Sequence, residues 1–236
     1  MIQVPELGLY RRATALALIV APALFLLDNI IHPKEYERDN EVRQLVEIAA
    51  HPDRWQLAHA LGFISIVVFA AAVLGLAFLV RRRQPRFGLW AGALGVTGLL
   101  GLAAVITIDG YTWGALGEAA RSRGSSPETV ALTLREVQQN DWSLLYYITP
   151  LAWIIGMGML ALGAARQGAV PVWAGVLLAV GSVMVGIETA VISNAYFIAA
   201  AAVLAAGSVA VAISIARMSD AAFARGGNAP ESAELS

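Results

Sequence analysis

The stretch that decides the fold is WQLAHALGFISIVVFAAAVLGLAFLV, residues Trp55–Val80. It runs for 26 residues, and His59 is its one ionisable side chain. About 20 apolar residues in a helix cross the roughly 30 Å of hydrocarbon in a bilayer. Backbone N–H and C=O groups find no water in lipid, so a spanning segment of this kind must be a helix. The stretch therefore predicts a transmembrane helix.

Five further apolar stretches precede and follow it. They are Ala13–Ile31, Phe87–Ile108, Leu144–Ala165, Val170–Ile187 and Ala195–Ala216. Hydrophobic residues make up 58% of the chain and charged residues 14%, which excludes an ordinary soluble domain. We predict an all-α, polytopic membrane protein whose six transmembrane helices lie in residues 1–224. Residues 225–236 are rich in Gly, Ala, Ser and Glu, and we predict a disordered tail there.

Charge is distributed unequally between the segments that connect these stretches. If the N-terminus is cytoplasmic, the cytoplasmic segments hold nine of the 16 basic residues but only four of the 17 acidic ones. The nine are Arg11, Arg12, Arg81, Arg82, Arg83, Arg86, Arg166, Arg217 and Arg225. Arginine and lysine are enriched in short cytoplasmic loops, so we predict that both termini are cytoplasmic. Usage rich in Ala, Gly and Arg with a single lysine, Lys34, indicates a GC-rich bacterial genome, and we therefore predict the inner (plasma) membrane.

Two outer loops carry helical patterns of their own. The first is Pro33–Ala50, and the second runs from Gly110 to Asp141 with a typical helix start at Ser126. Apolar residues recur on one helical face at Val42, Leu45, Val46 and Ala49 in the first loop and at Val130, Leu134 and Val137 in the second. We predict two short amphipathic helices. They either rest on the outer membrane surface as structured loops or form a lid over a binding site.

An internal similarity appears when the chain is shifted by 83 residues. The shift lays Trp90-Ala91-Gly92 on Trp173-Ala174-Gly175 and gives nine identities in the 24 positions from Gly75 to Gly98. This predicts that the hairpin of spans two and three is duplicated as spans four and five, as in transporters built from parallel repeats. Shared composition and a common turn sequence are the alternative explanation.

The candidate site lies at the outer face, where histidines and intramembrane acids gather. Acids near hydrocarbon are costly, and they usually face a polar interior or a working site. The residues concerned are His32, His51 and His59 with Asp28, Asp109 and Glu188. We predict an outward-facing pocket with His32, His59 and Asp109 as metal ligands, Asp28, Asn194 and Tyr146 as ligand-binding residues, and Glu188 as the catalytic base. Local hydrogen bonds between helices are the simpler alternative.

Histidine and carboxylate together suit zinc or another divalent metal. Water on such a metal could attack an ester or amide, with Glu188 as general base. Heme is a less favoured cofactor, because it would require His32 and His59 to face each other. The chain has no cysteine, which excludes thiolate metal sites and disulfides. No phosphate-binding glycine loop or nucleic-acid-binding patch is present.

Three motifs carry a resemblance to known proteins. They are Arg11-Arg12-Ala13 before the first span, His51–Leu57 (HPDRWQL) before the second, and the two Trp-Ala-Gly sequences. With these motifs the chain resembles uncharacterised six-span bacterial integral membrane proteins that contain a domain of unknown function. The resemblance covers most of the chain. It implies the six-helix fold and no particular activity.

Three functions remain open from the sequence. The first is a bundle that binds a metal or small ligand in the outer pocket, including a metal-dependent membrane hydrolase. The second is a small-solute transport component, which the repeat and the alanine stripe Ala13, Ala17 and Ala21 favour. The third is an accessory subunit with no site of its own. All three place the chain in the lipid bilayer, and a membrane-protein partner or a homo-oligomer is compatible with each.

Overall fold

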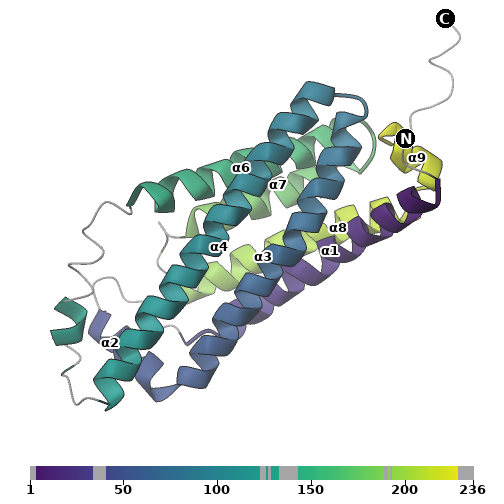
Figure 1. Ribbon diagram of the computed structural model, residues 1–236. Helices are drawn as coiled ribbons and strands as arrows, with labels where there is room; N and C mark the ends of the chain where they lie inside the picture. Colours follow the sequence, from purple (N-terminus) through teal and green to yellow (C-terminus); the bar gives the residue numbers. More distant parts are fainter. Residues whose placement is uncertain are drawn as a thin grey trace, which may run out of the picture.

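A computed structural model describes residues 4–33, 41–122, 126, 129–132, 143–188, 191 and 193–227. All the elements in this part of the chain are α-helices (Figure 1). They are α1 (Val4–Ile31), α2 (Glu41–Ala50), α3 (Pro52–Arg81), α4 (Pro85–Ser122), α6 (Ser143–Arg166), α7 (Val172–Gly186), α8 (Asn194–Arg217) and α9 (Asp220–Arg225). The all-α prediction is confirmed.

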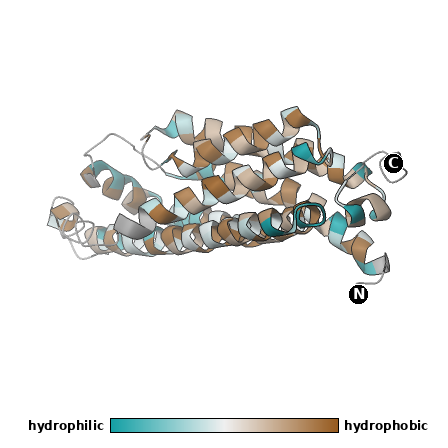
Figure 2. Ribbon diagram, turned by 90° about the horizontal axis from the view of Figure 1, so that it is seen from above, coloured by the Kyte–Doolittle hydropathy of each residue, from teal (hydrophilic) through white to brown (hydrophobic). Residues whose placement is uncertain are grey.

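Five of these helices are long and apolar enough to cross a membrane, namely α1, α3, α4, α6 and α8. The remaining apolar helix, α7, has 15 residues and is therefore about 22 Å long. Figure 2 shows hydrophobic residues along the lengths of the long helices and hydrophilic residues gathered toward their ends. The protein is a multi-pass membrane protein by helix length and hydropathy. The stretch predicted as a fifth span corresponds to the shorter α7.

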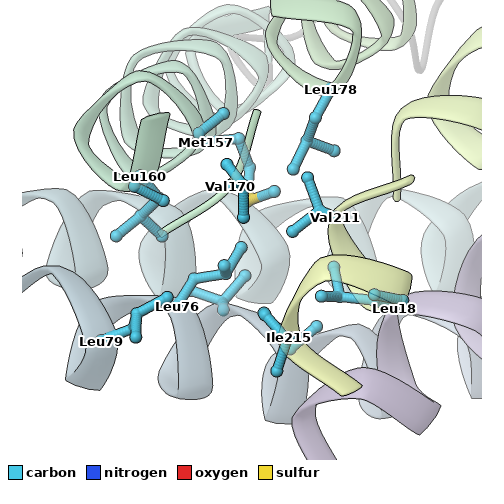
Figure 3. Packing of buried hydrophobic residues seen from close by; sticks show 14 of the residues in the cluster. Leu18, Leu76, Leu79, Met157, Leu160, Val170, Leu178, Val211 and Ile215 are labelled. Carbon is cyan, nitrogen blue, oxygen red and sulfur yellow. The ribbon is translucent and has the colours of Figure 1, made fainter. Parts of the chain in front are cut away.

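The six apolar helices form a closed ring in chain order. Each of α1, α3, α4, α6, α7 and α8 packs against the next, and α8 returns to α1. α3 also contacts α6 across the ring. Figure 3 shows buried side chains from these helices meeting inside the ring, among them Leu18, Leu76, Met157, Leu178 and Ile215. The hydrophobic core of the protein is therefore the interior of the ring.

The outer faces of the ring helices are apolar as well. Each of the six helices exposes at least one large hydrophobic side chain: Leu16, Val67, Leu100, Leu151, Val176 and Ile213. Apolar surface of this extent is typical of contact with a membrane. These faces are expected to contact lipid.

Glycines allow α4 and α6 to cross closely. A Cβ atom on Gly98 of α4 would collide with the backbone of Trp153 in α6. In the reverse direction, a Cβ atom on Gly156 of α6 would collide with the backbone of Gly95 in α4. Close backbone approach of this kind gives the van der Waals contact that drives helix association in lipid.

α4 is longer than predicted. The third span was expected to end at Ile108 and to be followed by a loop from Gly110, but α4 continues without a break to Ser122. The reason is that Gly110–Ser122 contains no proline and several good helix formers, so the helix persists after the apolar sequence ends. The extension projects beyond the other ring helices at what we name the α2 end of the bundle (Figure 1).

α2 lies within the first predicted loop and packs on this extension of α4. Its buried hydrophobic residues are Leu45 and Ile48, whereas Val46, assigned to the apolar face from the sequence, is half exposed. In the second loop the Ser126 hydroxyl accepts a hydrogen bond from the Thr129 backbone N–H at 3.3 Å. Val130 and Ala131 then pack against Leu45. Leu134 and Val137 of the predicted second helix lie outside the described residues.

The opposite end of the bundle, which we name the terminal end, is closed by α9. Phe223 of α9 is completely buried, and its ring lies 6.3 Å from that of Tyr10 and 5.6 Å from that of Phe78. Asp220 at the start of α9 forms an ion pair with Arg11 at 2.8 Å. Three aromatic rings and one ion pair therefore hold α9 against α1 and α3.

Arginines at the terminal end also cap helix carbonyls. Arg11 donates to the Ala216 carbonyl at 2.7 Å, and Arg82 donates to the Ala224 carbonyl at 2.6 Å. Cations are favourable at helix C-termini, where the last carbonyl groups lack partners within the helix. The first residues of the predicted tail take part in this end: Gly226 stops α9 with a φ of 84°, and Gly226 and Gly227 are buried. Residues 228–236 lie outside the described part of the chain.

Candidate functional site

A cluster of rings and one carboxylate surrounds His59 at the α2 end. The Nε2 atom of His59 lies 3.4 Å from the Asp109 carboxylate, and Nδ1 lies 3.0 Å from the Trp55 carbonyl. The Trp55 indole donates a hydrogen bond to the Gly110 carbonyl at 2.8 Å. The ring of His32 lies 4.9 Å from that of His59 and 4.7 Å from that of Trp55, measured between centroids. Three helices, α1, α3 and α4, therefore meet at this cluster.

The local sequence explains how the cluster forms. Trp55 and His59 are four residues apart, so they stack on one face of α3. The His32 backbone N–H donates to the Asp28 carbonyl at 2.9 Å, which extends the last turn of α1 as far as His32. Gly110 is required by the close approach of α4, because a Cβ atom there would lie 2.5 Å from the His59 ring.

The three predicted metal ligands thus come near one another but do not form a metal centre. Both ring nitrogens of His59 face oxygen atoms of Trp55 and Asp109. The rings of His32 and His59 are in direct contact, which leaves no space for a heme iron between them. Within the described ranges, no group of three His, Asp or Glu side chains is placed to hold a metal ion. The structure gives the metal hypothesis no support.

The other predicted site residues do not join this cluster in a single pocket. Asp28 is buried and faces Gly62, where a Cβ atom would lie 2.9 Å from its carboxylate. Asn194 begins α8 and is exposed. Tyr146 belongs to α6, but its side chain lies outside the description. Glu188 follows the C-terminal end of α7 and lines a separate space inside the ring.

That space is a cavity of about 80 Å³, and residues from all six ring helices line it. Ten of its fourteen lining residues are apolar: Phe25, Ile66, Phe69, Leu99, Leu102, Val105, Ile106, Pro150, Val185 and Leu204. The other four are Ser65, Thr149, Trp153 and Glu188. A mostly apolar pocket with a few converging polar groups is the usual form of a small-molecule site.

Trp153 is the polar group that the sequence analysis missed. It is 2% exposed, and its ring stands edge-on to that of Phe69 at 5.3 Å. Its indole N–H makes no hydrogen bond to any part of the chain that the structure describes. An indole nitrogen can only donate, and a buried donor without a partner costs about 1–3 kcal/mol. The sequence carried one signal for it: Trp153 lies within a span, whereas membrane tryptophans concentrate at the interfaces.

A second, larger space is a groove of about 630 Å³ between α3 and α4 near the α2 end. His59 lines this groove and not the cavity, whereas Glu188 lines the cavity and not the groove. Ile106 of α4 lines both spaces. The single outer pocket predicted from the sequence is therefore two spaces, with Ile106 in the wall of each.

Comparison with known proteins gives a family and no activity. Residues 13–223 match the family described as a domain of unknown function (DUF4386). No curated protein and no solved structure gives a significant match. The matched region includes nearly all of the ring, the His59 cluster, the cavity and the buried Phe223 of α9. The resemblance to six-span proteins of unknown function is thereby made specific, and the chain belongs to the DUF4386 family.

Proposed function

We propose that this protein binds a small amphiphilic molecule in the cavity at the centre of its membrane-embedded ring. The observation that carries the proposal is Trp153, which lines the cavity and whose buried indole N–H has no hydrogen-bond partner among the described residues. A ligand that offers an oxygen or nitrogen acceptor to this N–H would remove the cost of burying it. The function is then that of a binding protein or a small-solute transport component.

The cavity wall defines the chemical class of the ligand. Ten apolar residues favour a short hydrocarbon group. Glu188 offers a carboxyl group at the same cavity, which favours a hydroxyl or amine and disfavours a second carboxylate. A water needs about 10–15 Å³ of such space, so a cavity of about 80 Å³ admits a molecule of roughly five to eight heavy atoms. A short alcohol or amine fits these requirements.

The alternatives receive less support from the same cavity. A hydrolase needs an activated nucleophile or a metal, and the described lining residues provide Glu188 with neither a histidine nor a lysine beside it. An accessory subunit without a site predicts no cavity in the ring. A transport role is supported by the position of the cavity inside a ring of six helices and by the closure of the terminal end by α9.

Val185→Phe is expected to abolish binding of 1-hexanol and hexylamine at the cavity. Val185 lines the cavity, and a phenyl ring there occupies the space that the ligand needs. Val176→Phe is the matched control, because Val176 lies on the same helix, α7, but faces outward. Isothermal titration calorimetry in lipid nanodiscs measures both variants. The difference between them separates binding at the cavity from partition into lipid.

Hexanoate is expected to bind at least tenfold more weakly than hexanol, because of Glu188. Trp153→Phe, which removes the N–H and keeps an aromatic ring, is expected to weaken hexanol binding by about fivefold. Equal heats for the Val185→Phe and Val176→Phe variants would contradict a ligand site in the ring.

We infer that all six apolar helices span the membrane, with both termini in the cytoplasm. α7 is short, but it is packed between α6 and α8, and a bilayer accommodates a short span by local thinning at modest cost. The turns at the terminal end contain Arg81–Arg83 and Arg166, which supports a cytoplasmic location for that end. The inner membrane of a bacterium is the proposed location, with residues 1–224 as the transmembrane domain.

Single cysteines test this orientation directly, because the chain has none of its own. In intact cells, a membrane-impermeant maleimide is expected to label Ala50→Cys at the end of α2 and to leave Arg225→Cys at the end of α9 unlabelled. Both positions are exposed. Permeabilised cells, in which both cysteines should react, provide the control. The reverse pattern would invert the proposed topology.

We also propose that the α3–α4 hairpin is duplicated as α6–α7. The α7–α8 crossing supports this, because Cβ atoms on Gly181 and Gly207 would collide with the backbones of Leu204 and Leu178. Gly181 and Leu178 are 83 residues beyond Gly98 and Gly95, the residues of α4 at the α4–α6 crossing. The two crossings thus use equivalent positions on α4 and α7. A homo-oligomer or a membrane-protein partner stays a prediction.

A further inference from the structure

The groove between α3 and α4 is distinct from the central cavity and changes in polarity along its length. Gly110 of α4 lies beside His59 of α3, and Gly114 lies beside Trp55. The two helices are therefore antiparallel here, and higher residue numbers on α4 lie closer to the α2 end. At the end of the groove farther from the α2 end, the lining residues include Phe63 and Ile106. Toward the α2 end they include Tyr111, Gln56 and Glu118. The groove is thus apolar at one end and polar at the other.

Small residues hollow the groove out. Gly110, Gly114 and Ala115 of α4 and Ala60 of α3 all line it. Phe63 and Tyr111 at its margins are exposed, so the groove opens on the surface of the ring. α3 and α4 are both long enough to cross a membrane. The end of the groove at Phe63 and Ile106 is therefore accessible to lipid molecules rather than only to water.

The polar end of the groove carries a paired positive and negative charge. Glu118 lines the groove, and Arg121 donates to its carboxylate from Nε at 3.0 Å and from Nη2 at 2.8 Å. Both side chains are at least half exposed, so either can bind a further group. A carboxylate recognises an ammonium group, and a guanidinium recognises a phosphate. A headgroup that contains both an ammonium and a phosphate complements this pair.

The level of the groove relative to the membrane follows from the length of α4. About 20 helical residues cross the hydrocarbon, so α4, which begins at Pro85, leaves it near Ile106. Glu118 lies twelve residues, about 18 Å, further along the helix than Ile106. Its side chain leans back toward the membrane, because helical side chains point toward the N-terminus, but a headgroup held there stands above the level of the surrounding headgroups. Tyr111, between these two levels, is placed where aromatic residues favour the interface.

We propose that this groove binds one phosphatidylethanolamine molecule. Its acyl chains lie against Phe63 and Ile106, and its ammonium and phosphate groups lie at Glu118 and Arg121. The site lies on the lipid-facing surface of the ring and does not depend on the proposed ligand of the central cavity.

Native mass spectrometry of the detergent-purified full-length protein tests the assignment. Dioleoyl phosphatidylethanolamine, phosphatidylglycerol and phosphatidylcholine are titrated separately. We expect one tightly retained phosphatidylethanolamine per chain and weaker retention of the other two lipids. Ala115→Trp, which fills the groove, is expected to remove that lipid. Ala199→Trp is the matched control, because Ala199 is also an exposed alanine near the α2 end but lies on α8.

The headgroup contact has its own variant. Glu118→Gln is expected to weaken the binding of phosphatidylethanolamine about threefold, the size of an exposed ion-pair effect. It is expected to strengthen the binding of phosphatidylglycerol, because Arg121 loses its partner. Asp53 is an exposed acid outside the groove, and Asp53→Asn is expected to change the binding of neither lipid. Equal loss in the two tryptophan variants, equal retention of the three lipids, or equally tight binding of soluble phosphoethanolamine would each overturn the proposal.

Discussion

Gly156→Ala is expected to destabilise the bundle by about 3 kcal/mol, whereas Gly158→Ala two residues further along α6 is expected to be neutral. A Cβ atom on Gly156 would collide with the backbone of Gly95. Backbone atoms cannot move aside as the end of a long side chain can. The substitution therefore has to separate α4 from α6 along the crossing. That separation also removes contacts made at Gly98, the reciprocal glycine of the same crossing.

The control is unusually close in sequence. A Cβ atom on Gly158 would meet nothing within 4 Å, and alanine is the better helix former of the two residues. Denaturation with sodium dodecyl sulfate in mixed micelles, followed by near-ultraviolet circular dichroism, measures the free energy of unfolding of both variants. Equal stability of the two variants would show that the α4–α6 crossing is not as close as described.

Phe223→Ala is expected to cost about 3 kcal/mol and to release α9 from the terminal end. Phe223 is completely buried against Tyr10 and Phe78. α9 has only six residues, too few for a helix that is stable alone in water. Once the phenyl ring is removed, the remaining Arg11–Asp220 pair is partly exposed and is not expected to hold the helix in place.

Hydrogen exchange with mass spectrometry distinguishes this local release from general destabilisation. Backbone amides of α9 are expected to lose protection in the Phe223→Ala variant, while those of α8 keep it. Leu9→Ala at the same end of the bundle removes an exposed side chain and is expected to leave both helices protected. Simultaneous loss of protection in α8 and α9 would mean that Phe223 supports the whole bundle rather than the attachment of α9.

The sequence predicted the ring helices well because each contains a long apolar run, and five of them are long enough to cross a membrane. Hydropathy failed at the end of α4. Asp109 ends the apolar run there, but helix propensity continues to Ser122. α9 was missed for a related reason, since six residues leave no periodic pattern and the helix depends on contacts with Tyr10 and Phe78.

The site was only partly predictable. The approach of His59 to Asp109 followed from placing both near one face of the membrane, and the structure brings them within 3.4 Å. The separation of Glu188 from His59 did not follow, because the order of six helices around a ring cannot be read from their hydropathy. Trp153 lies within an apolar stretch, away from the interfaces that membrane tryptophans favour, but this position does not show which way its indole N–H faces. Its role depends on the shape of a cavity that all the ring helices form together.

The contact between α1 and α8 has a consequence for biosynthesis. The first and last helices of the ring are neighbours, so the ring closes only when the end of the chain has entered the membrane. Until α8 is inserted, Leu204 is missing from the cavity wall that Phe25 and Val185 also line. The cavity is then an open groove that lipid fills. A nascent chain that stops before α8 thus exposes to the bilayer the polar groups Glu188 and Trp153. Insertion of the last helix is the step that completes the proposed binding cavity, and we expect membrane proteases to recognise chains that fail at this step by their exposed polar groups.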